Sequence, residues 1–184
     1  MLLRDTGKKF DPAPEGLNHA VCVDCVDLGL QETAWGPKPK ISVVWELDLI
    51  NEKTGKRFLV SRWFGATLAS KGALRPLLES WRGKPFSREE LAGFDPEALV
   101  GVNAQVQIVH VLKDDGDVSA RVQAVVGAPK GVPKIHPSKD YVRVKDRPGT
   151  PTASEAHTEQ DDDLVPCGGG YHGESNGNPA TSID

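Results

Sequence analysis

The sequence predicts a mainly β fold with one helical region in its middle and a C-terminal tail outside the folded domain. Three observations support this prediction: several segments alternate between apolar and polar residues, one segment has helical periodicity, and the composition changes near residue 148. The chain of 184 residues is long enough for one domain with a hydrophobic core and a tail. We therefore expect a domain over residues 1–147 and a tail over residues 148–184.

The first three strands are expected before residue 65. Residues 20–28 are rich in Val and Cys, residues 41–49 alternate between apolar and polar side chains, and residues 57–64 follow a turn at residues 51–55. This pattern predicts strands, and the short turn predicts that the second and third strands form a hairpin. Residues 31–40 contain Gly and Pro and are expected to form the loop between the first two strands.

A helical region is expected next. The spacing i, i+3, i+4, i+7 of one apolar helix face is shared by Leu74, Leu77, Leu78 and Trp81. Pro76 would either kink this helix or occupy its first turn. A capping-box pattern at residues 87–90 and an Asp-Pro pair at residues 95–96 indicate two further helix starts.

Two more strands complete the predicted domain. Residues 102–110 and 118–126 again alternate, and Asp115-Gly116 between them is typical of a tight hairpin turn. Three strands, a helix and two strands follow one another in the five-stranded OB barrel, whose helix lies between strands three and four. The sequence thus predicts an OB-type barrel, with an open α+β sheet as the alternative.

Charge separates the domain from the tail. The formal net charge is −4, but residues 1–150 carry +3 and residues 151–184 carry −7 with no Lys or Arg. The tail is rich in Gly, Ser, Thr, Pro, Asn and acidic residues, so it has too few apolar side chains to form a core. We expect a disordered acidic tail.

Membrane insertion and secretion are not indicated. No run approaches the ~20 apolar residues that span a bilayer, the first five residues do not resemble a signal peptide, and the cysteine count is odd at three. We expect a cytoplasmic protein without disulfides and with no membrane partner.

No pattern indicates catalysis. The sequence has no phosphate-binding loop of Walker type, no Gly-x-Ser-x-Gly and no His-Glu-x-x-His. Cys22 and Cys25 form a lone Cys-x-x-Cys motif, and residues three apart in a regular strand point to opposite faces. We therefore expect core packing for at least one of them, no metal site, no cofactor and no enzymatic activity.

Binding of single-stranded nucleic acid is the favoured function, because it needs exposed aromatic rings beside cations. In the third predicted strand, Arg57, Ser61 and Trp63 share one face, whereas Arg62 lies on the other, mostly apolar face. Trp45 and Trp81 fall on apolar faces and are expected in the core. The candidate nucleic-acid-binding residues are Trp35, Lys38, Lys40, Arg57, Arg62, Trp63, Arg121 and Lys130, with Lys134 as a further basic candidate.

Several short segments resemble a group of bacteriophage replication-region proteins. The segments are residues 45–47, 55–58, 74–75, the Leu-Glu-Ser-Trp-Arg-Gly-Lys-Pro-Phe stretch at 78–86, residues 90–95, Gly101 and residues 128–131. The resemblance covers residues 12–145. That group is regarded as single-stranded DNA-binding proteins with an OB-like fold, which implies binding of single-stranded DNA without sequence specificity during phage replication or recombination.

The tail carries a second resemblance. Asp161, Asp162, Asp163 and Leu164 are similar to the acidic tip of bacterial single-stranded DNA-binding proteins, which implies docking of replication or recombination proteins. An anionic tail could also compete with DNA phosphates for the basic residues of the domain. The alternative functions are a non-enzymatic OB-fold module that binds replication proteins, and a nuclease subunit; an oligomer is compatible with each.

Overall fold

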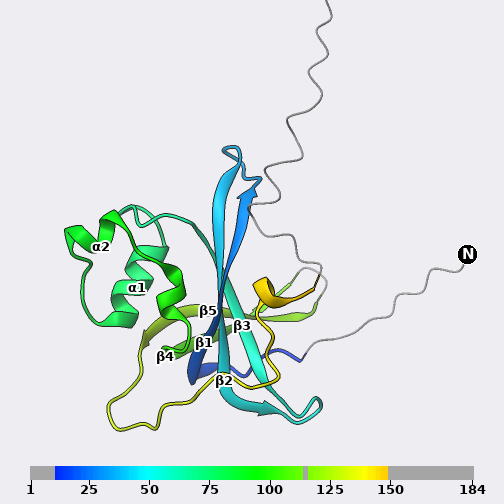
Figure 1. Cartoon of the computed structure of the whole chain (residues 1–184). Coiled ribbons are helices and arrows are strands. Elements are labelled where there is room, and N and C mark those ends of the chain that lie inside the picture. The colour runs from blue at the N-terminus through cyan, green and yellow to red at the C-terminus, as the bar shows by residue number, and fades with distance from the viewer. Residues whose placement is uncertain (1–10, 114–115, 149–184) are drawn as a thin grey trace, which may run out of the picture.

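The computed structural model describes residues 11–113 and 116–148 (Figure 1). It is mainly β, with one five-stranded antiparallel sheet and few helices, and its strand order is β3-β2-β1-β4-β5. The strands are β1 (Gly16–Gln31), β2 (Lys38–Asn51), β3 (Lys56–Gly65), β4 (Asn103–Leu112) and β5 (Val118–Gly127). The helical elements are α1 (Leu74–Arg82), α2 (Arg88–Ala92), η1 (Pro96–Leu99) and η2 (Val144–Asp146).

Strand β1 is longer than the first strand predicted at residues 20–28, and it pairs with two other strands. Its first residues pair with β4, from Gly16 to Val21, while its residues from Ala20 to Gln31 pair with β2. A register shift between Cys22 and Asp24 marks a bulge at the point where β1 passes from one partner to the other. Beyond β3, β1 and β2 continue as a two-stranded arm with the loop of residues 32–37 at its tip (Figure 1).

The sheet is not closed, which corrects the prediction of a closed five-stranded barrel. Strands β3 and β5 are its two edges, and no ladder joins them in the part of the chain that the structure describes. Instead, Arg62 of β3 donates from Nη1 to the carbonyls of Val122 (3.2 Å) and Gln123 (2.9 Å). A register shift leaves Gln123 outside the β4–β5 pairing, so a side chain bridges the edges where a backbone ladder would have closed the barrel.

Helix α1 packs the core against one face of the sheet. It buries Leu74, Leu77, Leu78 and Trp81, and burial of each leucine contributes about 1.5–3 kcal/mol. Pro76 is the third residue of α1 and therefore occupies its first turn, one of the two placements that the sequence allowed. Gly127 permits the close approach of α1 to β5, because a Cβ there would lie 3.0 Å from the Trp81 carbonyl oxygen.

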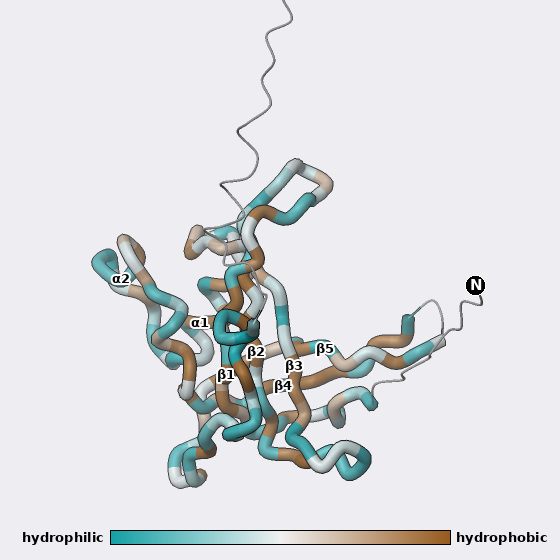
Figure 2. The backbone as a smooth tube through the Cα atoms, turned by 45° about the vertical axis from the view of Figure 1, so that its right-hand side comes forward, coloured by the Kyte–Doolittle hydropathy of each residue, from teal (hydrophilic) through white to brown (hydrophobic). Residues whose placement is uncertain are grey.

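The two tryptophans assigned to the core are confirmed there. The ring centroids of Trp45 and Trp81 are 5.8 Å apart, and Trp81 donates from Nε1 to the Asn103 carbonyl at 2.9 Å. Figure 2, in which the backbone is coloured by residue hydropathy, shows hydrophobic residues along the strands. At Ser87 the capping box is present, and Asp95 caps η1, as the sequence predicted.

Residues 134–147, named here the strap, cross the other face of β1–β3. Figure 1 shows the strap, with η2, on the opposite side of β1 and β2 from α1. At its start, Ile135 exchanges hydrogen bonds of 2.9 Å with the Asn103 side chain of β4. Val21 and Val23 of β1 are buried without belonging to the main core, which is consistent with cover from the strap. Across residues 11–113 and 116–148, no helix has the length and apolar character of a membrane span.

Candidate nucleic-acid interface

The face of β1–β3 that lies opposite the core is named here the outer face. On β2 it carries Lys38, Lys40, Ser42, Val44, Glu46 and Asp48, which alternate with the core residues. On β3 it carries Leu59, Ser61 and Trp63, which pair with Glu46, Val44 and Ser42 in that order. The strap covers the end near Glu46 and leaves the end near Lys40 uncovered, so we describe a sealed half and an open half.

The open half presents Trp63 to solvent. Its side chain is 57% exposed on edge strand β3, directly opposite Ser42. The Lys40 Nζ atom lies 5.9 Å from the Trp63 ring centroid, a cation–π distance. An aromatic face and an ammonium group therefore sit side by side on an accessible surface.

A second pair of the same kind, Trp35 and Lys38, lies at the tip of the arm. Trp35 is 83% exposed, and the Lys38 Nζ atom is 5.5 Å from its ring centroid. A tight turn holds the ring outward: Thr33 and Gly36 exchange backbone hydrogen bonds of 3.2 and 3.0 Å, and Trp35 N donates to the Thr33 hydroxyl. Gly36 supplies the φ of +89° that this turn requires.

The lysines of the two pairs lie on the same face of β2. Lys38 and Lys40 are two residues apart on one strand, so their side chains leave the same face about 6.6–6.8 Å apart. Rings that stack on bases, each beside a cation that can approach a phosphate, are the elements of a single-strand binding surface. The open half therefore brings together four of the eight predicted residues: Trp35, Lys38, Lys40 and Trp63.

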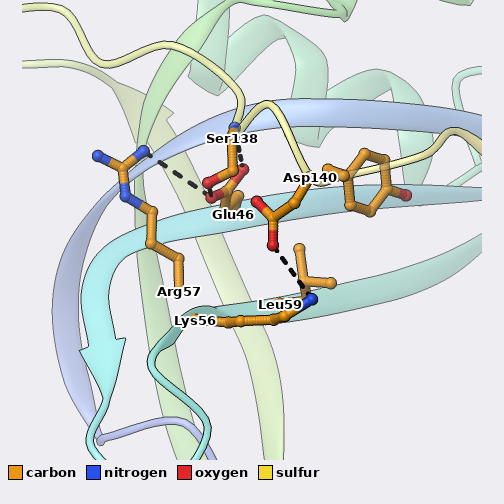
Figure 3. Close-up of a pocket in the computed structure, with 7 residues that line it drawn as sticks. Glu46, Lys56, Arg57, Leu59, Ser138 and Asp140 are labelled. Atoms are coloured by element: carbon orange, nitrogen blue, oxygen red, sulfur yellow. Dashed lines mark hydrogen bonds and ion pairs between the residues drawn. The ribbon is translucent and has the colours of Figure 1, made fainter.

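In the sealed half the charges are paired internally. Glu46 is only 2% exposed and accepts hydrogen bonds from the Ser138 backbone N–H (2.9 Å) and from the Ser138 hydroxyl (Figure 3). Arg57 lies 3.8 Å from Glu46 and 3.2 Å from Asp48. Its Nη1 also donates to the His136 carbonyl at 3.1 Å, so the guanidinium that the sequence assigned to DNA is held by two carboxylates and the strap.

Asp24 of β1 is the second buried carboxylate beneath the strap. It is 1% exposed and accepts hydrogen bonds from the Val144 N–H (2.8 Å), Arg143 Nε (3.1 Å) and the Tyr141 hydroxyl (3.3 Å). Burial, with the Asp24 charge beside it, raises the pKa of Tyr141 to about 12, so the phenol stays protonated at neutral pH. Three strap groups thus satisfy one carboxylate.

Arg143 extends this network to η1. Its Nη2 and Nη1 donate to the two carboxylate oxygens of Glu97 at 2.7 and 2.8 Å, and Lys145 Nζ lies 3.1 Å from Glu97. Hydrogen bonding from Arg143 is the main reason that the pKa of Glu97 is lowered to about 2. The strap is therefore held to the sheet by hydrogen bonds to Glu46 and by an ion pair with Asp24, and it is held to η1 by the ion pairs with Glu97.

The remaining predicted residues lie elsewhere. Arg62 bridges the sheet edges, with its guanidinium 5.2 Å from the Phe64 ring. Arg121 is exposed on β5, next to the Val122 carbonyl that Arg62 contacts, whereas Lys130 and Lys134 are exposed after β5. The tail residues Asp161, Asp162, Asp163 and Leu164 lie outside the described residues.

Sequence reasoning missed the strap as part of this surface. Tyr141, Arg143, Lys145 and Arg147 alternate along it, a period-two run of aromatic and cationic side chains. That alternation was a usable signal, although it does not reveal that two of these residues contact a buried Asp24.

The Cys-x-x-Cys motif corrects a second prediction. The bulge between Cys22 and Asp24 brings both thiols to the same side of β1, with their Sγ atoms 4.0 Å apart. Both are free, and the contact with Cys25, which favours the protonated thiol, raises the pKa of Cys22 together with burial. Within residues 11–113 and 116–148, no cluster of three His, Cys, Asp or Glu side chains accompanies them as a metal site. Cys22 belongs to the core, as expected for at least one of the pair.

Comparison with protein-family models and with curated proteins finds no match for this chain. The resemblance to phage single-stranded DNA-binding proteins therefore stays a prediction.

Proposed function

We propose that this chain binds single-stranded nucleic acid, single-stranded DNA in particular, through the open half of the outer face. The observation that carries this proposal is the pair of exposed tryptophans, each beside a lysine of β2: Trp63 on the outer face of β3, and Trp35 in the loop of residues 32–37. Every base has a π-face, so stacking on such rings would be independent of sequence. The protein would hold and protect a strand without catalysing a reaction.

The strand order supports the proposal. Strands β3-β2-β1-β4-β5, with α1, α2 and η1 between β3 and β4, are compatible with an OB-type barrel that is open between β3 and β5. OB folds bind single strands over strands two and three and over the loop between strands one and two. Trp63 on β3 and Trp35 in the β1–β2 loop lie in those two regions.

The resemblance over residues 12–145 supports a proposal for the biological process in which this chain acts. It favours a role in phage DNA replication or recombination in the host cytoplasm, with replication or recombination proteins as further partners.

Titration of labelled poly-dT tests the proposal. Affinity should fall steeply with salt, because neutralised phosphates release counterions. Trp35→Ala and Trp63→Ala should each cost ~1–3 kcal/mol of binding free energy, the usual contribution of a stacked base. Leu17→Ala is the matched control, since Leu17 is also 57% exposed but lies where β1 pairs with β4. Absence of binding at low salt would contradict the proposal.

The acidic tail is proposed to compete with DNA for the same lysines. Deleting residues 151–184 should tighten binding several-fold at low salt, because it removes an anionic competitor that is covalently attached. The gain should shrink at high salt, where the tail and the phosphates are both screened. Replacing Asp161, Asp162 and Asp163 with Asn in the full chain should give part of the gain. An unchanged affinity after deletion would remove competition from the proposal.

A protein-interaction module is the second candidate, favoured by the same exposed rings. Tryptophan is enriched among the residues that dominate protein interfaces, and a domain charge of +3 is small for nucleic-acid binding. A DNA-free complex with a replication protein that is lost in Trp35→Ala and Trp63→Ala, together with no binding of poly-dT, would favour this candidate.

A further inference from the structure

A groove of about 370 Å³ lies between the strap and the outer face, beside the open half. Its floor is apolar, with Val26 of β1, Val44 of β2 and Leu59 of β3. Ser61 lies on the β3 side, and Tyr141 and Arg147 of the strap form the opposite wall. The sheet and the strap thus build one concave site from residues more than a hundred positions apart in the chain.

The groove begins where the Trp63 surface ends. Ser61 precedes Trp63 by two residues on the same face of β3, and it pairs with Val44, two residues beyond the Ser42 that pairs with Trp63. Trp63 and the groove are therefore neighbouring positions about 6.6–6.8 Å apart along the strands. Lys38, beside Trp35, and Lys40, beside Trp63, continue the same face of β2 away from the groove.

The strap closes the far end of this path. The Tyr141 hydroxyl is bonded to the buried Asp24, and beyond it Ser138 covers Glu46. A strand that followed the outer face past the groove would meet these two carboxylates and the strap above them. The strap covers the outer face there, so the groove is the last position available to the strand.

The groove has the chemistry of a nucleotide site. Val26, Val44 and Leu59 offer an apolar surface for the face of a base, and Ser61 offers a hydroxyl at its edge. Arg147 donates from Nε to the Val142 carbonyl at 3.1 Å. Within the part of the chain that the structure describes, its other guanidinium nitrogens have no partner and can bind a phosphate.

We propose that this groove binds one base of a single strand, with Arg147 on its phosphate, and that the strap ends the strand's path there. This inference rests on the proposed function and adds a third base position to the two tryptophans. It predicts a short contact site, at the low end of the ~4–16 nucleotides that OB folds occupy. An apolar peptide side chain is the competing occupant.

Oligo-dT of two to ten nucleotides tests the inference against the wild-type protein. Affinity should rise with length until the third base position is filled. Beyond that length it should rise only slightly, because a longer strand offers more ways to place three bases on the site. Ser61→Phe, which fills the groove from an exposed position, should remove the last rise and leave shorter oligonucleotides unaffected. Arg147→Ala should lower the salt slope of binding to longer oligonucleotides by about one, as expected for one lost phosphate contact.

Arg88→Ala is the matched control, because Arg88 is an exposed arginine on α2, away from the outer face. It should change neither the dependence of affinity on oligonucleotide length nor the salt slope. Should Ser61→Phe fail to fold, Arg147→Ala decides alone. If both variants bind every length as the wild type does while Trp63→Ala weakens binding, the groove proposal is overturned and the proposed function stands. Absence of binding to any length at low salt overturns both.

Discussion

The open and sealed halves of the outer face belong to the same three strands, yet charged side chains are exposed in one half and paired with one another in the other. Along β2, the outer side chains change from Lys38 and Lys40 at one end to Glu46 and Asp48 at the other. The cations lie beside exposed aromatic rings, whereas Glu46 is buried under Ser138 and Asp48 is paired with Arg57. One strand thus presents exposed cations beside aromatic rings at one end and an internal ion-pair network at the other.

The comparison teaches that residue type alone does not make a cation available to a ligand. Arg57 and Lys40 lie on neighbouring strands of one face, and both were predicted to contact DNA. Arg57 has carboxylates within 4 Å and a carbonyl of the strap, while Lys40 has only the Trp63 ring among its described contacts. The strap covers the end of β2 that carries Glu46 and leaves the end that carries Lys38 and Lys40 uncovered.

The largest expected effect comes from removing Asp24, the carboxylate that holds the strap. Asp24→Ala leaves Arg143, Tyr141 and the Val144 N–H without their buried partner. Breaking a buried, hydrogen-bonded ion pair costs ~3–5 kcal/mol, and we expect the low end because Arg143 keeps Glu97. The midpoint and slope of urea denaturation measure this loss.

Glu52→Ala provides the control for this variant, because Glu52 is an exposed acid in the β2–β3 turn and should change stability by less than about 0.5 kcal/mol. A loss of similar size in the two variants would mean that Asp24 does not hold the strap.

The next effect separates the two halves by their response to salt. Lys38→Ala and Lys40→Ala should each lower the slope of log affinity against log salt by about one, because each removes one phosphate contact. Arg57→Ala should leave that slope unchanged and lower stability instead, since its guanidinium neutralises Glu46 and Asp48. Fluorescence titration at four salt concentrations gives the slopes. A reduced slope in Arg57→Ala would erase the distinction between the halves.

The strands and the apolar helix face were predictable because they depend on local periodicity. Trp45 and Trp81 fall on such faces, and both are in the core. The open seam between β3 and β5 was not predictable, because it follows from the unpaired Gln123 and the side chain of Arg62, neither of which changes the alternation of its strand. A single bulge likewise reversed the expected orientation of the Cys-x-x-Cys motif.

The two exposed tryptophans of the candidate site were also predictable from the local sequence. Trp35 and Trp63 stood out because a large ring in a loop, or on the polar face of a strand, has no local core to join. The strap alternates between residue types over residues 141–147, but its contacts depend on Asp24 and Glu46, which in sequence are polar positions like any other. Contacts between single polar side chains separated by about a hundred residues leave no pattern in one sequence.

The smallest expected effect is the pH dependence of the contact between the strap and η1. Because Arg143 lowers the pKa of Glu97 from 4.5 to about 2, the folded protein binds this proton less readily than the unfolded chain does. The ion pair therefore contributes its full stability above about pH 5 and loses it as the pH falls toward 2. Glu97 is 43% exposed, so solvent screening limits the contribution to under about 1 kcal/mol.

Glu97→Gln isolates this contribution from the other carboxyl groups that titrate in the same range. The difference in unfolding free energy between the wild type and Glu97→Gln should be present at pH 7 and should shrink between pH 5 and pH 2, because Arg143 and Lys145 then face a neutral group in both proteins. Urea denaturation at half-unit intervals of pH measures the difference. A difference that stays constant over this range would show that Glu97 does not bind the strap through its charge, and the sealed half would then depend on Asp24 and Glu46 alone.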